Sequence, residues 1–216
     1  MGKLGILLAV LATLALPAPV SARTMSAQDV LTVCLTTPKD PMDVLVYFHA
    51  NGWADATKAD IDLLRDAVAL TFFATGGSPE KGLKENGYWE KLQKFSTEIL
   101  DGTSKEPWKV LHHRETGAVL ILFPTTTPKI GLKCRLSVPS APSKAQEFHP
   151  KLPAPAAPAL IESTLDGHDL AVSRVTIITN SVSISQPAVD DALGAKTDIS
   201  AAFMTSINYP AWAVTP

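Results

Sequence analysis

The sequence predicts an α+β fold, with N-terminal helices packed on an antiparallel β-sheet and a proline-rich connector before the last strands. Apolar residues recur at helical spacing up to about residue 100, and after Trp108 the pattern changes to alternation and β-branched runs. The predicted strands follow the helices instead of alternating with them. This order is typical of an antiparallel sheet with helices on its face, and not of βαβ units.

The first 22 residues have the organisation of a secretory signal peptide. A basic start containing Lys3 precedes an apolar run over residues 4–16, and residues 20–22 form the small-residue pattern Val-Ser-Ala before Arg23. The apolar run is shorter than the roughly 20 residues that a membrane span needs, and no later run approaches that length. We therefore expect cleavage near Ala22 and a mature protein in the periplasm or outside the cell, without a membrane span.

Two helices are predicted in the first part of the mature chain. Residues 26–29 have the form of a capping box, and they open an apolar stripe made of Ala27, Leu31, Cys34 and Leu35. This spacing places Cys34 on the core side of its helix. A second helix is expected over residues 42–50, and Gly52 ends it.

Two longer helices follow. Residues 57–60 form another capping pattern, and the apolar stripe after it consists of Ile61, Leu64, Val68 and Phe72. The glycine pair at 76–77 ends this helix. A fourth helix is expected over residues 88–100 and stops at Gly102.

Three strands are predicted next. Residues 109–114 and 118–123 are β-rich runs joined by a short loop that contains Gly117, which indicates a hairpin. Residues 132–138 alternate apolar and polar side chains without interruption, so we expect a strand with one buried face. Cys134 lies on the apolar side of that strand.

Residues 139–158 are rich in Pro, Ala, Ser and Lys and are predicted to form the connector. Further strands are expected over residues 171–179, 181–186 and 201–209, with a short helix around 188–193. The predicted organisation is therefore a signal peptide at 1–22, the helices and first strands at 23–138, the connector at 139–158, and a segment at 159–216 that completes the same domain.

The chain has only two cysteines, Cys34 and Cys134, and both lie in the part predicted to be exported. An oxidising compartment favours a disulfide bond between them. Two separate buried thiols are the alternative. Redox chemistry is disfavoured because redox cysteine pairs usually lie close together as Cys-x-x-Cys.

The charge of the chain restricts its partners. The formal net charge is −2, and no run of Lys and Arg occurs. Nucleic acids and anionic membrane surfaces bind clustered basic residues. We therefore expect neither to be the main partner.

The histidines offer the remaining candidate chemistry. His112 and His113 are adjacent in a predicted strand, so their side chains point to opposite faces and cannot chelate one ion together. Residues 166–169, Asp-Gly-His-Asp, bring three ligand types into a predicted turn, but Asp-Gly is itself a turn signal. We predict no metal site and no cofactor, and we keep His113 and His168 as candidate binding residues.

No catalytic residue is predicted, because the chain contains neither a Gly-x-Ser-x-Gly elbow nor a Ser-x-x-Lys pair in a suitable context. We expect an exported module that binds a protein or an envelope component without catalysis. The alternative is a small hydrolase or ligand-binding enzyme whose site assembles from distant residues such as His113 and His168.

Overall fold

A computed structural model describes residues 27–35, 43–76, 87–125, 129–139, 161–170, 175–184, 186–194 and 199–210. Its helices are α1 (Ala27–Leu35), α2 (Val44–Ala50), α3 (Ile61–Thr75), α5 (Tyr88–Leu100) and α6 (Gln186–Leu193), with the 3-10 turn η2 (Lys58–Asp60) before α3. Its strands are β1 (Trp53–Asp55), β2 (Lys109–His113), β3 (Val119–Thr125), β4 (Lys129–Pro139), β5 (Ile161–Leu170), β6 (Val175–Ile184) and β7 (Ile199–Pro210).

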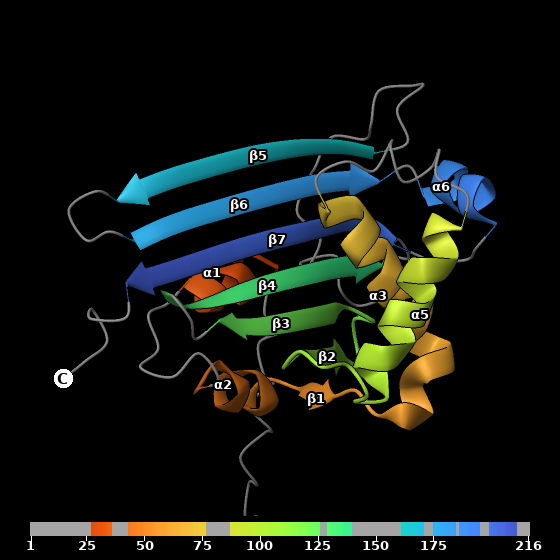
Figure 1. The fold of residues 1–216 in the computed structure, drawn as a ribbon, viewed down its shortest axis with the longest axis horizontal. Helices are drawn as coiled ribbons and strands as arrows, with labels where there is room; N and C mark the ends of the chain where they lie inside the picture. Colours follow the sequence, from red (N-terminus) through yellow and green to blue (C-terminus); the bar gives the residue numbers. More distant parts are fainter. Residues whose placement is uncertain are drawn as a thin grey trace, which may run out of the picture.

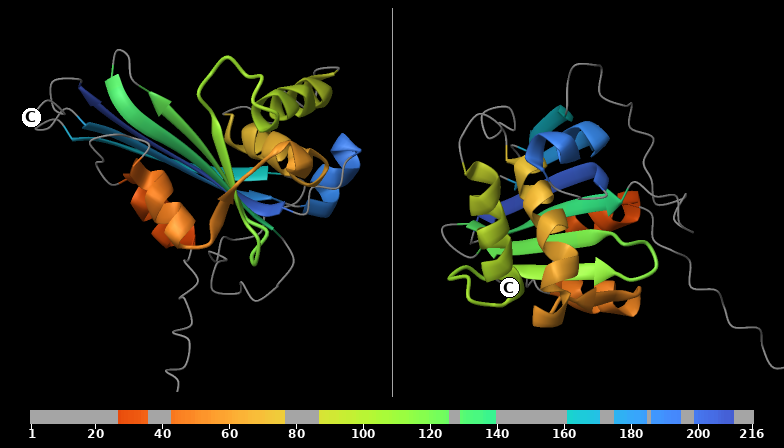
Figure 2. Two further views of the ribbon diagram at one scale, coloured as in Figure 1. Left: turned by 90° about the horizontal axis from the view of Figure 1, so that it is seen from below. Right: turned by 90° about the vertical axis from the view of Figure 1, so that its right-hand side faces the viewer.

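The described strands form one sheet in the order β1-β2-β3-β4-β7-β6-β5, and every neighbouring pair is antiparallel (Figure 1). Helices α1 and α2 lie on one face of the sheet, called the α1 face here, while α3, α5 and α6 lie on the other, called the α3 face (Figure 2). The predicted α+β fold is confirmed.

Helices α3 and α5 begin where the sequence predicts them. Thr57 and Asp60 form the expected capping box, in which the Thr57 backbone N–H donates to Asp60 Oδ2 at 2.8 Å. The box starts η2, and α3 continues from it. Helix α5 spans the predicted residues 88–100, and Gly87 precedes it with a φ of +75°. Helix α2 begins at Val44, two residues later than predicted.

The strands beyond the connector join the middle of the sheet. Strand β4 pairs with β3 on one side and with β7 on the other, and β7 leads outward to β6 and β5. Pro139 is the last residue of β4. The remainder of the predicted connector, residues 140–158, lies outside the described residues.

Two predictions for the strand region are wrong, and two strands, β1 and β5, were not predicted. Residues 166–169 form no turn: they lie inside β5, where Asp166 pairs with Thr179 and Asp169 with Thr176. The predicted break at Asn180 does not exist, because β6 runs through it. Strand β1 was not predicted at all, since three residues are too few to show a period. In β5 the ten paired positions outweigh the local turn preference of Asp-Gly.

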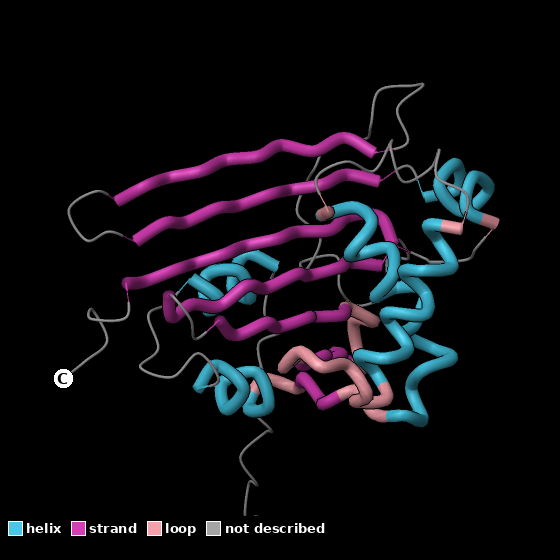
Figure 3. The backbone as a smooth tube through the Cα atoms, in the orientation of Figure 1, coloured by secondary structure: helices cyan, strands magenta, loops and turns pink. Residues whose placement is uncertain are grey.

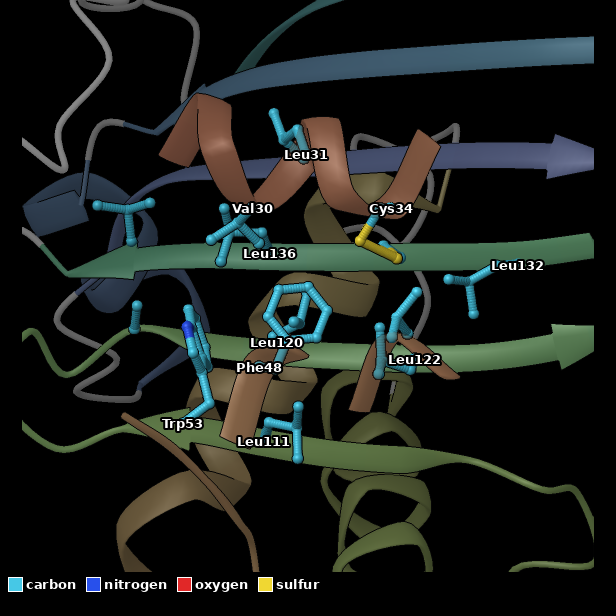
Figure 4. Close-up of a cluster of buried hydrophobic side chains, with 14 residues drawn as sticks. Val30, Leu31, Cys34, Phe48, Trp53, Leu111, Leu120, Leu122, Leu132 and Leu136 are labelled. Carbon is cyan, nitrogen blue, oxygen red and sulfur yellow. A yellow bond between two sulfur atoms is a disulfide. The ribbon is translucent and has the colours of Figure 1, made fainter. Parts of the chain in front are cut away.

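The core on the α1 face contains the disulfide bond. Cys34 of α1 and Cys134 of β4 are bonded, with their Cα atoms 6.2 Å apart and both side chains fully buried. Figure 4 shows the bond between helix and strand, beside the apolar side chains that include Phe48, Leu120 and Leu136. The predicted disulfide and the docking of α1 on β4 are confirmed.

The α3 face is also covered, although the sequence predicts a polar face for β4. Helices α3 and α5 lie side by side over one end of the sheet (Figure 3). They bury Val110, Val119 and Ile121 in one cluster, and Ser137 of β4 is only 1% exposed. At Ser137, alternation in β4 therefore separates two buried environments, whereas Lys133 and Arg135 on the same face stay partly exposed.

Candidate functional site

A groove opens where the β2–β3 hairpin turns, between the first half of α3 and the end of β4. Its cavity volume is about 520 Å³. The apolar part of the lining comes from α3, β3 and β4 and consists of Leu63, Leu64, Ala67, Val119 and Pro139. The polar part consists of Asp60, His112 and Arg114, while the ring of the neighbouring His113 lies on the α1 face against Trp53. An open, mainly apolar hollow with a few polar groups is the usual form of a binding site.

Leu63 forms an exposed apolar edge of the groove. Its side chain is 72% exposed, whereas Leu64 beside it is 5% exposed and Val119 is 1% exposed. Leu63 stands off the apolar stripe of α3, so folding does not require it to be apolar. A single exposed leucine is common on protein surfaces, but here it continues the apolar lining of the groove outward.

Asp60 has a structural role at this site. Its Oδ2 accepts the Thr57 backbone N–H and the Thr57 hydroxyl, each at 2.8 Å. These hydrogen bonds lower the pKa of Asp60, with smaller contributions from the charges of His112 and Arg114. The carboxylate is thus ionised and engaged in capping, which favours an electrostatic role over proton transfer.

His113 is held by its neighbours. Thr116 Oγ1 lies within hydrogen-bond distance of His113 Nδ1, at 3.1 Å, and accepts the Ala118 backbone N–H at 3.2 Å. The ring packs edge-on against Trp53 at 5.4 Å. A Cβ at Gly52 would meet His113 Nε2 at 3.0 Å, and the φ of +84° there also requires glycine.

Burial is the main cause that lowers the pKa of His113, against smaller opposing effects of Glu115 and the Asn51 backbone. The folded state therefore binds a proton less readily than the unfolded state, whose histidine has a pKa of about 6.5. We expect the free energy of unfolding to be highest above that pH and to fall as the pH drops through the folded-state pKa. Chemical denaturation at a series of pH values measures this.

The variant His113→Gln should remove most of this pH dependence, whereas His49→Gln, at an exposed histidine of α2, should keep it. An equal loss of stability on acidification in wild type and His113→Gln would show that other groups cause the effect.

The structure does not bring the two predicted histidines together. His113 lies in β2 and His168 in the edge strand β5, five strands away in the sheet. At about 4.8 Å for each strand, the separation is on the order of 24 Å. The side chain of His168 lies outside the described part of the structure. A joint site of these two residues is not formed, and each stays a candidate alone.

Within the described residues, no group of three or more His, Cys, Asp and Glu side chains is placed to hold a metal ion. None of the described helices has the length and apolar character that crossing a bilayer requires. In comparisons with protein-family models, curated proteins and solved structures, no match to the chain was found. The groove is therefore the feature of the described residues from which a function is inferred.

Sequence reasoning missed the groove because its parts are far apart in the chain. Asp60, His112 and Pro139 meet only after α3 packs on the hairpin and β4 lies beside β3. Leu63 gave one local signal, an apolar residue off the stripe of an otherwise amphipathic helix.

Proposed function

We propose that this protein is an exported, non-catalytic module whose groove binds an apolar segment of a protein or envelope component. The observation that supports this is the groove itself, with the exposed Leu63 on one side and the exposed Arg114 on the other. An apolar surface beside a cation suits a segment that carries an apolar side chain next to an acidic group.

The polar groups of the groove support binding over catalysis. Asp60 is engaged in its cap, and the ring of His113 lies on the other face of the sheet, with Trp53 and Thr116. Arg114 is exposed and charged, so it contributes to the rate and specificity of association more than to affinity. Removing Arg114 should therefore weaken binding most at low ionic strength.

Site-specific photocrosslinking tests this proposal. A photoreactive amino acid replaces Leu63 in one variant and Val46 in a matched control, because Val46 is equally exposed, at 74%, but lies on α2 over the opposite face. In cells that export the protein, position 63 should yield one discrete adduct that position 46 does not. The adduct should weaken when Arg114→Glu is added. The same adducts from both positions, or none from position 63, would contradict the proposal.

Export is tested separately. The signal-peptide pattern predicts that exported protein begins at Arg23 or within two residues of it. N-terminal sequencing of periplasmic or secreted material measures this. Recovery of the intact Met1 end from the membrane fraction would contradict both cleavage and export.

A further inference from the structure

Two cations lie next to each other on the α3 face of β4. Lys133 and Arg135 are two residues apart in the strand, so their side chains leave the same face. Arg135 lies 4.9 Å over the ring of Phe72, and its Nη1 donates to Thr75 Oγ1. Its Nε is buried and has no hydrogen-bond acceptor among the described residues. The guanidinium is thus held in place with part of its donor set unused.

A row of aromatic rings lies beside Lys133 and Arg135. The ring centroids of Phe72 and Trp108 are 5.2 Å apart, and those of Trp108 and Phe123 are 4.3 Å apart. Phe123 pairs with Lys133 across the β3–β4 ladder. Trp108 Nε1 is a second buried donor without an acceptor in the described part of the chain. Buried N–H groups are rarely left unpaired, so the inner side of this cluster is short of acceptors among the described residues.

Among the described residues, no salt bridge matches the positive charges of Lys133 and Arg135. Burial lowers the pKa of Arg135 to about 10, and burial followed by the charge of Arg135 lowers the pKa of Lys133. Glu106 is the carboxylate that acts on Lys133, while Arg135 is influenced by the Tyr88 phenol. The salt bridges found among the described residues include neither cation. Burying a cation without an anion is unfavourable, and a bound anion would remove that penalty.

We propose that Lys133 and Arg135 bind the carboxylate or phosphate group of a small molecule whose apolar body lies against the partly exposed Trp108 and Phe123. With Nη1 on Thr75 and Nε fully buried, Nη2 is the guanidinium nitrogen that remains for a charge-assisted hydrogen bond to an oxyanion. Lys133 adds a second positive charge two residues before Arg135 in β4, on the side of the sheet away from the β2–β3 turn.

Both cations keep part of their surface exposed, and the described helices of the α3 face cover only the end of the sheet that contains the β2–β3 turn (Figure 1). Lys133 is four residues along β4 from Ser137, the neighbour of Val119 in the groove, which is about 13 Å of strand. The anion site is therefore separate from the groove and does not depend on the function proposed for it.

Titration of the purified protein with defined anions tests the site. The probes are inorganic phosphate, phenyl phosphate and benzoate, each against sodium chloride at the same ionic strength. The readouts are the side-chain Nε–H resonance of Arg135 and the melting temperature. We expect phenyl phosphate or benzoate to shift this resonance and raise the melting temperature, with inorganic phosphate weaker because it has no apolar body. The stronger of the two aromatic probes identifies the preferred oxyanion.

Three variants sharpen the result. Arg135→Met keeps an unbranched side chain over Phe72 and should weaken probe binding about tenfold or more. Lys133→Gln should also weaken it, whereas Lys109→Gln removes an exposed cation from β2 and should leave it unchanged. If Arg135→Met does not fold, the wild-type titration and the two lysine variants still test whether the anion site exists. An Arg135 resonance that responds to no probe, or equal weakening in both lysine variants, would overturn the proposal.

Discussion

Reduction of the Cys34–Cys134 bond is expected to lower the free energy of unfolding by about 4 to 5 kcal/mol, because the bond closes a loop of roughly 100 residues in the unfolded chain. The crosslink joins α1 to the middle of the sheet, and α1 contacts mainly β4 and β7. A nine-residue helix is marginal on its own, so α1 depends on this attachment.

Denaturation of the oxidised and the reduced protein at one pH measures the effect. The double variant Cys34→Ala/Cys134→Ala should be destabilised at least as much and should not respond to reductant. Both sulfurs are buried, so reduction should be slow under native conditions and fast when denaturant opens the protein. A difference of less than about 1 kcal/mol between the oxidised and reduced forms would contradict the loop-entropy argument.

Elements with strong local signals were predictable from the sequence. The capping box at Thr57 and the stripe after it define α3 almost to the residue, and the loop at Gly117 defines the hairpin. The disulfide was predictable because Cys34 lies on the core side of a predicted helix and Cys134 on the apolar side of a predicted strand. The helix and hairpin predictions use local interactions, and the disulfide prediction combines two local patterns that lie 100 positions apart.

The errors occurred where distant pairing decides the structure. In β5, Asp166 and Gly167 have turn preferences, but the antiparallel ladder with β6 holds them extended. In β4, the alternation correctly gives a strand, but it cannot show that α3 covers the polar side and buries Arg135. Tertiary contacts override local preference in both cases.

The two candidate sites were not predictable from the sequence either, because each depends on tertiary packing. The groove needs α3, the hairpin and the end of β4 in one place, and the anion site needs Phe72, Trp108 and Arg135 from three separate elements. A basic pair spaced Lys-x-Arg in a strand is an ordinary sequence feature. Only the packing shows that these cations are partly removed from water.

Replacing Phe73 with alanine is expected to lower the free energy of unfolding of the whole chain by about 3 to 5 kcal/mol. Phe73 is 1% exposed and belongs to a cluster that joins α3 to β6, α6 and β7 through Ile184, Val189 and Ala202. If the segment at 159–216 completes the same domain as the helices, removing this ring must destabilise both parts together.

Hydrogen exchange resolved by residue tests this coupling. In Phe73→Ala, amides of β3 and amides of β7 should lose protection by the same free energy, and thermal unfolding should stay a single transition. Leu63→Ala, a change at an exposed residue of the same helix, should alter stability by less than about 0.5 kcal/mol. Two transitions, with β1 to β4 unfolding at an unchanged midpoint, would instead show that the C-terminal strands form a unit of their own despite sharing one sheet.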